Sequence, residues 1–292
     1  MPPENINNNN SAFSKVNIET EDIEMNLLLQ AIYFKYGYDF RNYSKAHLKR
    51  RVNQRLRLSS LNSISELQHR VLWEKEFYRM FIQDLSINVT EMFRDPEFYF
   101  AFRNKVIPDL STYAHIKVWH AGCSTGEEVY SLAIILKEEN LLSRTRIYAT
   151  DINKNVLEIA KQGIYSSKEM EIYAENYINS GGKGKLSDYY TSKYGSVIFD
   201  KTLSKNVVFA DHNLVTDSVF AEVNLVFCRN VLIYFDKELQ NKVLKLFTDS
   251  IIKRGFLCLG TKESIRFSDI EKNYEVLDKK LKIYKKVHVS NG

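Results

Sequence analysis

The sequence contains few of the residues that form disulfide frameworks or metal sites. Only three cysteines occur in 292 residues, and Cys123, Cys228 and Cys258 are far apart. An odd number of distant cysteines argues against a disulfide framework or a zinc site and is typical of a reducing cytoplasm. The six histidines show no ligand spacing, so we expect no metal site.

Long hydrophobic runs are also missing. No apolar run approaches the roughly 18 residues needed to cross a bilayer. The asparagine-rich start lacks the basic and apolar segments of a signal peptide. The net charge of +5 is too small to indicate a nucleic acid partner. We therefore expect a cytoplasmic protein whose length allows one large α/β domain and a smaller one.

Residues 1–87 predict a polar tail followed by a small helical domain. Residues 1–20 are asparagine-rich and predict a disordered tail. Within 21–87, apolar residues at helical spacing predict four helices: from Glu21 to a stop at Gly37, from Ser44, over Ile64–Trp73 and over Glu74–Ile82.

The second of these helices is strongly basic. No acid occurs between Arg41 and Leu61, so the usual glutamate partners at i±4 are missing. The basic side chains outside its apolar stripe are Lys45, Lys49, Arg50, Arg51, Arg55 and Arg57. A helix whose charge is not neutralised locally favours an acidic partner, either a protein helix or nucleic acid phosphates. The alternative is a solvated surface with no partner.

A glycine turn joins a predicted strand to a predicted helix near the middle of the chain. The strand begins at Lys117, the turn uses Gly122 and Gly126, and the helix covers Val129–Leu136. Glycines allow a ligand to approach the backbone. The spacing matches neither a nicotinamide motif nor a Walker loop, and two glutamates at the helix start would repel phosphates. The loop predicts a ligand with a cationic, phosphate-free end, unless its role is only structural.

The predicted second strand, Arg146–Asp151, ends in an acid. Asp151 lies about 25–30 residues after the glycine turn, where a ribose diol is bound in nucleotide folds. The alternative is that Asp151 caps the next helix, Val156–Gln162. Residues 164–205 do not show the strand and helix pattern of a parallel sheet. Their short β-like runs predict an inserted antiparallel sheet.

Three further strands complete the predicted α/β domain, after which one edge strand ends the chain. The strands are expected at Asn206–Ala210, Glu222–Cys228, Phe256–Gly260 and, at the edge, Leu281–Val287. Asp236 is expected to cap a helix that Gly255 closes, and Asp95 is expected to cap a helix from Pro96 to about Val106.

Polar groups gather at the carboxyl ends of these strands, which in an open α/β sheet form the ligand crevice. They are Gly122–Glu128, Asp151, Asn213 with Leu214, and Arg229–Tyr234. An acidic crevice without a phosphate-binding loop suits S-adenosylmethionine, whose sulfonium and amino groups are cationic and whose ribose offers a diol.

Four ordered motifs resemble those of CheR-type methyltransferases. They are Asn-Val-Thr-Glu-Met-Phe-Arg-Asp (88–95), Ala-Gly-Cys-Ser-Thr-Gly-Glu-Glu (121–128), Ala-Thr-Asp-Ile (149–152) and Phe-Cys-Arg-Asn-Val-Leu-Ile-Tyr-Phe-Asp (227–236). The resemblance covers residues 21–287. It implies a protein-glutamate O-methyltransferase that methylates bacterial chemoreceptors. The implied fold is a helical domain (21–87), then a class I, Rossmann-like α/β methyltransferase domain (88–287) with an inserted β-subdomain at 164–205.

The resemblance also assigns roles to residues. Asn88, Thr90, Arg94 and the loop at Gly122 would face the cofactor, with Glu128 at its methionyl end and Asp151 at its ribose. Asn213 and Leu214 would line the adenine side, and Arg229 with Asn230 the floor. Arg94 and Tyr234 would orient the accepting carboxylate. Val129 departs from the family motif, which commonly has proline there.

The partners follow from the same resemblance. Receptor methylation sites lie on glutamate-rich helices, which Arg50, Arg51, Arg55 and Arg57 would dock. Some members also bind a receptor C-terminal peptide at the β-subdomain, and the sequence does not decide this. We expect a monomer.

Three alternatives remain at this stage. A nucleic acid methyltransferase commonly has Asn/Asp-Pro-Pro-aromatic after the fourth strand, whereas this chain has Cys-Arg-Asn-Val and no proline beyond Pro108. A non-catalytic sensing relative would have less reason to keep Arg94, Glu128, Asp151 and Tyr234. A methyltransferase of another signalling system would share every motif.

Overall fold

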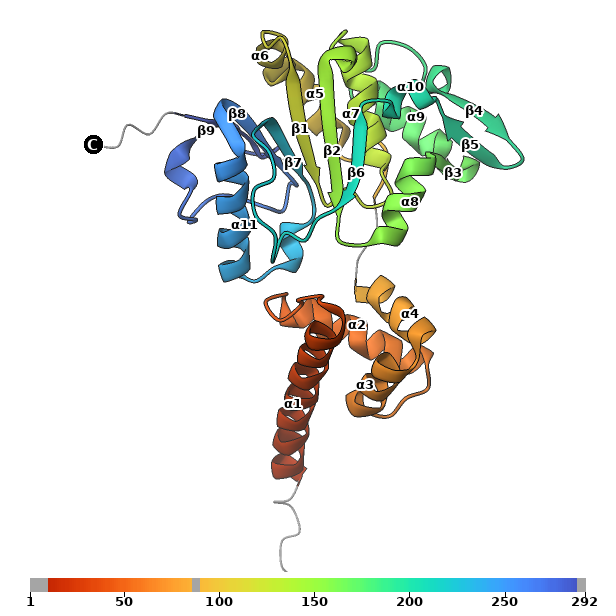
Figure 1. Cartoon of the computed structure of the whole chain (residues 1–292), viewed down its shortest axis with the longest axis vertical. Helices are drawn as coiled ribbons and strands as arrows, with labels where there is room; N and C mark the ends of the chain where they lie inside the picture. Colours follow the sequence, from red (N-terminus) through yellow and green to blue (C-terminus); the bar gives the residue numbers. More distant parts are fainter. Residues whose placement is uncertain (1–9, 86–89, 288–292) are drawn as a thin grey trace, which may run out of the picture. The chain divides into compact units, whose positions relative to one another are not determined.

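The computed structural model describes residues 10–85 and 90–287, and for residues 10–19 it describes the backbone alone. The chain divides into two compact units, Met1–Ile87 and Asn88–Gly292 (Figure 1). None of the helices in the described ranges is both long enough and apolar enough to cross a membrane.

The first unit is helical, as expected. Its elements are α1 (Asn10–Tyr36), α2 (Lys45–Leu58), α3 (Ile64–Trp73) and α4 (Lys75–Leu85). Leu28, Ile32, Val52, Leu67 and Phe81 are fully buried at the centre of this unit. The expected tail needs correction, because α1 begins at Asn10 and residues 10–20 are therefore helical.

The second unit contains a seven-stranded sheet in the order β6-β2-β1-β7-β8-β10-β9 (Figure 1). The strands are β1 (Ile116–Ala121), β2 (Thr145–Asp151), β6 (Val207–Asp211), β7 (Val223–Cys228), β8 (Ile251–Leu259), β9 (Tyr274–Asp278) and β10 (Ile283–Lys286). Neighbouring strands from β6 to β8 are parallel, and β10 is antiparallel to both β8 and β9. The carboxyl ends of the five parallel strands therefore meet at one edge.

Two expectations at the C-terminal end of the chain were wrong. The segment expected at the edge, Leu281–Val287, contains β10, which pairs on both sides, so β9 is the edge strand. The sequence pattern did not predict β9, because most residues of this strand are at least partly exposed and form no apolar run. Gly255 lies inside β8, and the preceding helix ends at Ser250. Ile251 and Ile252 continue the apolar pattern of that helix, so the sequence did not mark its end.

Helices pack beside the main sheet, and the inserted sheet forms a separate layer next to α9 (Figure 1). The helices are α5 (Pro96–Lys105), α6 (Ile107–Leu110), α7 (Glu127–Glu138), α8 (Lys154–Gln162), α9 (Met170–Asn179), α10 (Lys201–Ser204) and α11 (Lys237–Ser250). The inserted antiparallel sheet has the order β3-β5-β4, from β3 (Ile164–Ser166), β4 (Tyr190–Lys193) and β5 (Ser196–Phe199). The expected α/β unit with an inserted antiparallel sheet, after a helical unit, is confirmed, although α9 was not predicted.

Candidate active site

The glycine turn is tightly bound to the end of β2. The backbone N–H groups of Gly122 and Cys123 both donate to the Thr150 carbonyl, at 2.8 and 2.9 Å. Gly122 has a φ of +70°, and a Cβ built on it would lie 2.4 Å from a methyl group of Val231. Gly126 has a φ of +93°. An L side chain at Gly122 is therefore excluded by both conformation and space.

Asp151 presents a buried carboxylate at the end of β2. Its two oxygens accept N–H bonds from Ser124 and Asn153, each at 2.9 Å. The alternative that Asp151 caps α8 is wrong, because the side chain of Asn153 takes that role with an N–H bond from Asn155. Each carboxylate oxygen of Asp151 keeps a lone pair, and burial raises the pKa of this carboxyl against the effect of the backbone N–H bonds. These properties suit the two hydroxyls of a ribose.

Two buried polar atoms at the carboxyl ends of neighbouring strands lack partners in the part of the chain that the structure describes. Within the described ranges, the Ser124 hydroxyl and the side-chain oxygen of Asn230 are buried and accept no hydrogen bond. They follow β1 and β7, which are adjacent in the sheet. Buried polar groups are normally paired, so these two atoms indicate that a polar ligand fits between the two strand ends.

Arg229 forms the centre of a buried ion network. Its guanidinium pairs with Glu128, at the start of α7, and with Asp95, before α5. It also donates to the backbone carbonyl of Arg94 at 3.0 Å and lies 4.2 Å above the Phe98 ring. Burial alone would lower the pKa of Arg229, but the Glu128 charge and its other partners outweigh burial and raise it. The network holds the segment carrying Arg94 against the ends of β1 and β7.

Glu128 takes part in this network through one carboxylate oxygen. The Tyr99 hydroxyl donates to Glu128 Oε1 at 2.8 Å, and Arg229 contacts the same oxygen. Asp95 occupies the N-cap position of α5, as expected, but its backbone is left-handed and its side chain makes no capping bond. Its carboxylate pairs with Arg229 instead, a contact across 134 positions that sequence spacing does not reveal.

The segment after β7 is held by a residue that the sequence did not single out. The buried carboxylate of Glu263 accepts backbone N–H bonds from Asn230, Val231, Leu232 and Ile233 at 2.7–3.3 Å, and from Gly260 at 2.6 Å. Tyr234, which is half-buried, directly follows this anchored segment. No local motif could have identified Glu263, because four of its five partners lie about 30 positions earlier.

The remaining predicted cofactor residues lie at or near the same edge. Asn213 and Leu214 follow β6, and His212 donates its N–H to the Asp151 carbonyl at 3.2 Å. Leu214 is buried, and the side-chain oxygen of Asn213 accepts an N–H bond from Val215. Thr90 belongs to the second unit, and Asn88 lies outside the described residues.

The basic helix of the first unit is partly neutralised by neighbouring helices. Arg55 forms a two-pronged ion pair with Asp84 of α4, and Lys49 pairs with Glu21 of α1. The expectation that this charge has no local partner is therefore wrong at these two positions. Arg51 bonds to Gln54, while Arg50 and Arg57 are exposed.

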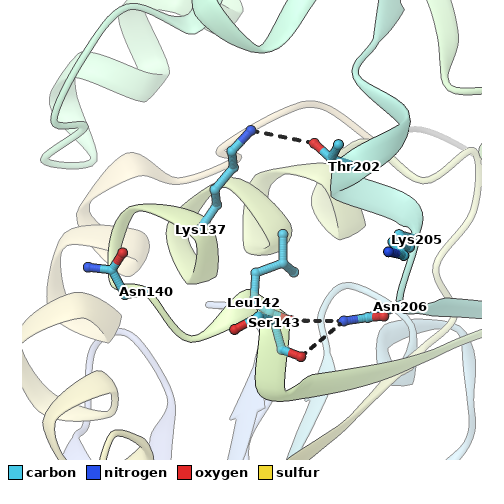
Figure 2. Close-up of a pocket in the computed structure, with 7 residues that line it drawn as sticks. All are labelled: Lys137, Asn140, Leu142, Ser143, Thr202, Lys205 and Asn206. Atoms are coloured by element: carbon cyan, nitrogen blue, oxygen red, sulfur yellow. Dashed lines mark hydrogen bonds between the residues drawn. The ribbon is translucent and has the colours of Figure 1, made fainter.

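A pocket of about 500 Å³ lies elsewhere in the second unit (Figure 2). It is lined by Lys137, Asn140, Leu142, Ser143, Thr202, Lys205 and Asn206. Lys137 and Asn140 lie at the C-terminal end of α7, and Asn206 directly precedes β6. This pocket is thus at the amino ends of the strands, opposite the glycine turn and Asp151.

Comparison with known proteins identifies the family of both units. The family model described as CheR methyltransferase, all-alpha domain, matches residues 23–86. The one described as CheR methyltransferase, SAM binding domain, matches residues 88–282. The chain belongs to the CheR methyltransferase family. S-adenosylmethionine is the cofactor of this CheR methyltransferase, and the crevice at Gly122 and Asp151 is the candidate site for it.

The alignments of this CheR methyltransferase with its relatives cover most of both chains. A protein of Pseudomonas putida named "Putative methyltransferase Cher3" is 55% identical to this chain. The alignment covers 91% of this chain and 97% of the length of that protein. Two proteins named "Chemotaxis protein methyltransferase" are each 29% identical. The alignment with the protein from Borreliella burgdorferi covers 89% of this chain and 94% of that protein. The alignment with the protein from Escherichia coli covers 87% of this chain and 87% of that protein.

Proposed function

We propose that this protein methylates glutamate side chains of bacterial chemoreceptors, forming methyl esters in the cytoplasm as a monomer. The observation that carries the proposal is the Arg229 network, which fixes the Arg94 segment beside the β7 end that leads to Tyr234. Two side chains suited to binding a carboxylate thus belong to segments that are anchored at the S-adenosylmethionine crevice. Relatives named chemotaxis methyltransferases support the choice of substrate.

The reaction makes few demands on the protein. Bound S-adenosylmethionine supplies an activated methyl group on a sulfonium. A glutamate carboxylate is ionised near pH 7, so an oxygen lone pair forms the new O–CH₃ bond while the C–S electron pair returns to sulfur. No proton moves, and the site needs no general base. We assign Arg94 and Tyr234 to orienting the accepting carboxylate, and catalysis to alignment and exclusion of water.

The direct test uses membranes from the source organism and methyl-labelled S-adenosylmethionine. Label that appears on a large membrane protein and is released by mild base identifies carboxyl methyl esters. Base-stable label, or label in nucleic acid, would contradict the proposal. Base-labile label on a signalling protein other than a chemoreceptor would support the second candidate, a CheR methyltransferase of another system. The most identical relative reported above is named without chemotaxis, which keeps that candidate open.

Tyr234→Phe should lower kcat while leaving S-adenosylhomocysteine affinity nearly unchanged. Removing one hydroxyl that orients the reacting carboxylate should cost roughly 100–1,000-fold in turnover, comparable to losing a positioned hydrogen-bond donor. The measurements are methylation kinetics and a calorimetric titration of S-adenosylhomocysteine. Tyr194→Phe is the matched control, since Tyr194 lies in the turn between β4 and β5 and is 93% exposed. A large loss of S-adenosylhomocysteine affinity in Tyr234→Phe would argue against the role.

Reversing the exposed charges of α2 should weaken receptor methylation. Arg50→Glu with Arg57→Glu is the informative pair, because Arg55 is already paired with Asp84. We expect KM for receptor membranes to rise about 10-fold at low salt and the salt dependence of KM to diminish. Lys75→Glu with Arg79→Glu makes the same charge change on the exposed face of α4 and serves as the control. If both pairs behave alike, α2 is not the docking helix.

A further inference from the structure

The loop after β8 has a buried side and an exposed side. Glu263, Ile265 and Ile270 are buried and hold the loop to the second unit. The exposed side chains Lys262, Arg266 and Phe267 project from the same loop, which also carries two exposed acids, Asp269 and Glu271. The exposed surface of residues 262–267 is therefore basic and aromatic, although Glu263 and Ile265 between these side chains are buried.

Phe267 has a conformation that packing does not explain. Its side chain is 85% exposed and its φ is +63°, in a region that bulky residues rarely adopt. Two side-chain acceptors fix the backbone: Glu271 accepts the N–H of Phe267 at 2.8 Å, and Ser264 accepts that of Arg266 at 3.0 Å. A strained, exposed aromatic held by such bonds indicates a binding role.

Arg266 and Lys262 add unneutralised charge to this surface. The Arg266 guanidinium lies 4.6 Å from the centre of the Phe267 ring. Among residues 20–85 and 90–287, no carboxylate forms an ion pair with either basic side chain. An arginine stacked on an aromatic ring is well suited to meet a carboxylate and an apolar side chain together.

The loop is directly coupled to the segment that carries Tyr234. Glu263 lies three residues before Arg266, and its carboxylate holds the backbone N–H groups of Leu232 and Ile233. The exposed side chains thus belong to the same sheet edge as the anchored segment leading to Tyr234. A substrate segment in contact with this loop would therefore be positioned relative to that tyrosine.

We propose that Lys262, Arg266 and Phe267 form a docking surface for the glutamate-rich helix that presents the accepting carboxylate. This assignment rests on the proposed function and adds a contact on the methyltransferase unit itself. The two cations attract glutamates on one face of the helix, and the Phe267 ring packs on an apolar side chain three or four residues away. The surface sets substrate affinity and takes no part in binding S-adenosylmethionine.

Arg266→Glu and Phe267→Ala test this surface in the full-length protein with receptor membranes. We expect KM for the membranes to rise at least about 10-fold in each, an effect typical of an interface anchor, with S-adenosylhomocysteine affinity and kcat at saturation within about 2-fold of wild type. Phe267→Tyr should retain wild-type KM because the aromatic ring is kept. Arg254→Glu is the matched control, since Arg254 is exposed near the opposite end of β8.

Each outcome bears on one proposal. Wild-type KM in both Arg266→Glu and Phe267→Ala would overturn the docking surface while leaving the proposed function intact. A rise in KM accompanied by a loss of S-adenosylhomocysteine affinity would also overturn the docking surface, because the loop would then act through the cofactor site. A wild-type protein that forms no base-labile ester would remove the proposed function, and the docking surface with it.

Discussion

Replacing Arg229 with methionine should destabilise the second unit by about 3–5 kcal/mol, since breaking a buried ion pair leaves its partner charge uncompensated. Glu128 is buried, and its carboxylate pairs with Arg229 and accepts a hydrogen bond from the Tyr99 hydroxyl. The same substitution releases the Arg94 carbonyl and Asp95, so we also expect methylation to fall to near background. Guanidinium denaturation followed by Trp119 fluorescence measures the effect, because Trp119 is fully buried in β1.

Two companion variants identify the cause. Lys280→Met removes a cation whose pairing with Glu97 is exposed, and it should change stability by less than about 1 kcal/mol. Adding Glu128→Gln to Arg229→Met should recover part of the loss, because the double variant no longer buries an unpaired carboxylate. A cost below about 1 kcal/mol for Arg229→Met would show that the network is not needed for stability.

Asp151→Ala should abolish most of the affinity for S-adenosylhomocysteine. A hydrogen bond to a charged acceptor contributes about 1.5–3 kcal/mol, and two ribose hydroxyls give an expected loss of at least about 100-fold at 1.4 kcal/mol per factor of ten. The variant also deprives the Ser124 and Asn153 N–H groups of their acceptor, so the glycine turn should loosen. Calorimetric titration measures the affinity directly.

Asp211→Ala is the matched control for Asp151→Ala. Asp211 is the register partner of Asp151 in the neighbouring strand, but its side chain is 63% exposed and pairs with Lys154. Its removal should leave S-adenosylhomocysteine affinity within about 3-fold, since an exposed ion pair contributes little. An equal loss in both variants would mean that the general negative charge of this edge, and not the Asp151 carboxylate, holds the ligand.

The sequence by itself determined the features that depend on neighbouring residues. Gly122 and Gly126 predicted a tight turn, and the apolar run of Glu222–Cys228 predicted a central strand. The structure has both. Asp151 was placed at the end of β2 because strand and helix patterns alternate clearly there. The local periods of helix and strand also separated the inserted sheet from the main one.

Only the tertiary structure decided which distant side chains meet. Arg229 joins Asp95 and Glu128 over more than 100 positions, and Glu263 holds the segment before Tyr234 from another loop. It also decided that Arg55 pairs with Asp84 and that β9, not β10, forms the sheet edge. Charge pairing and strand order depend on distances across the folded chain, and the spacing of residues along the sequence carries no record of them.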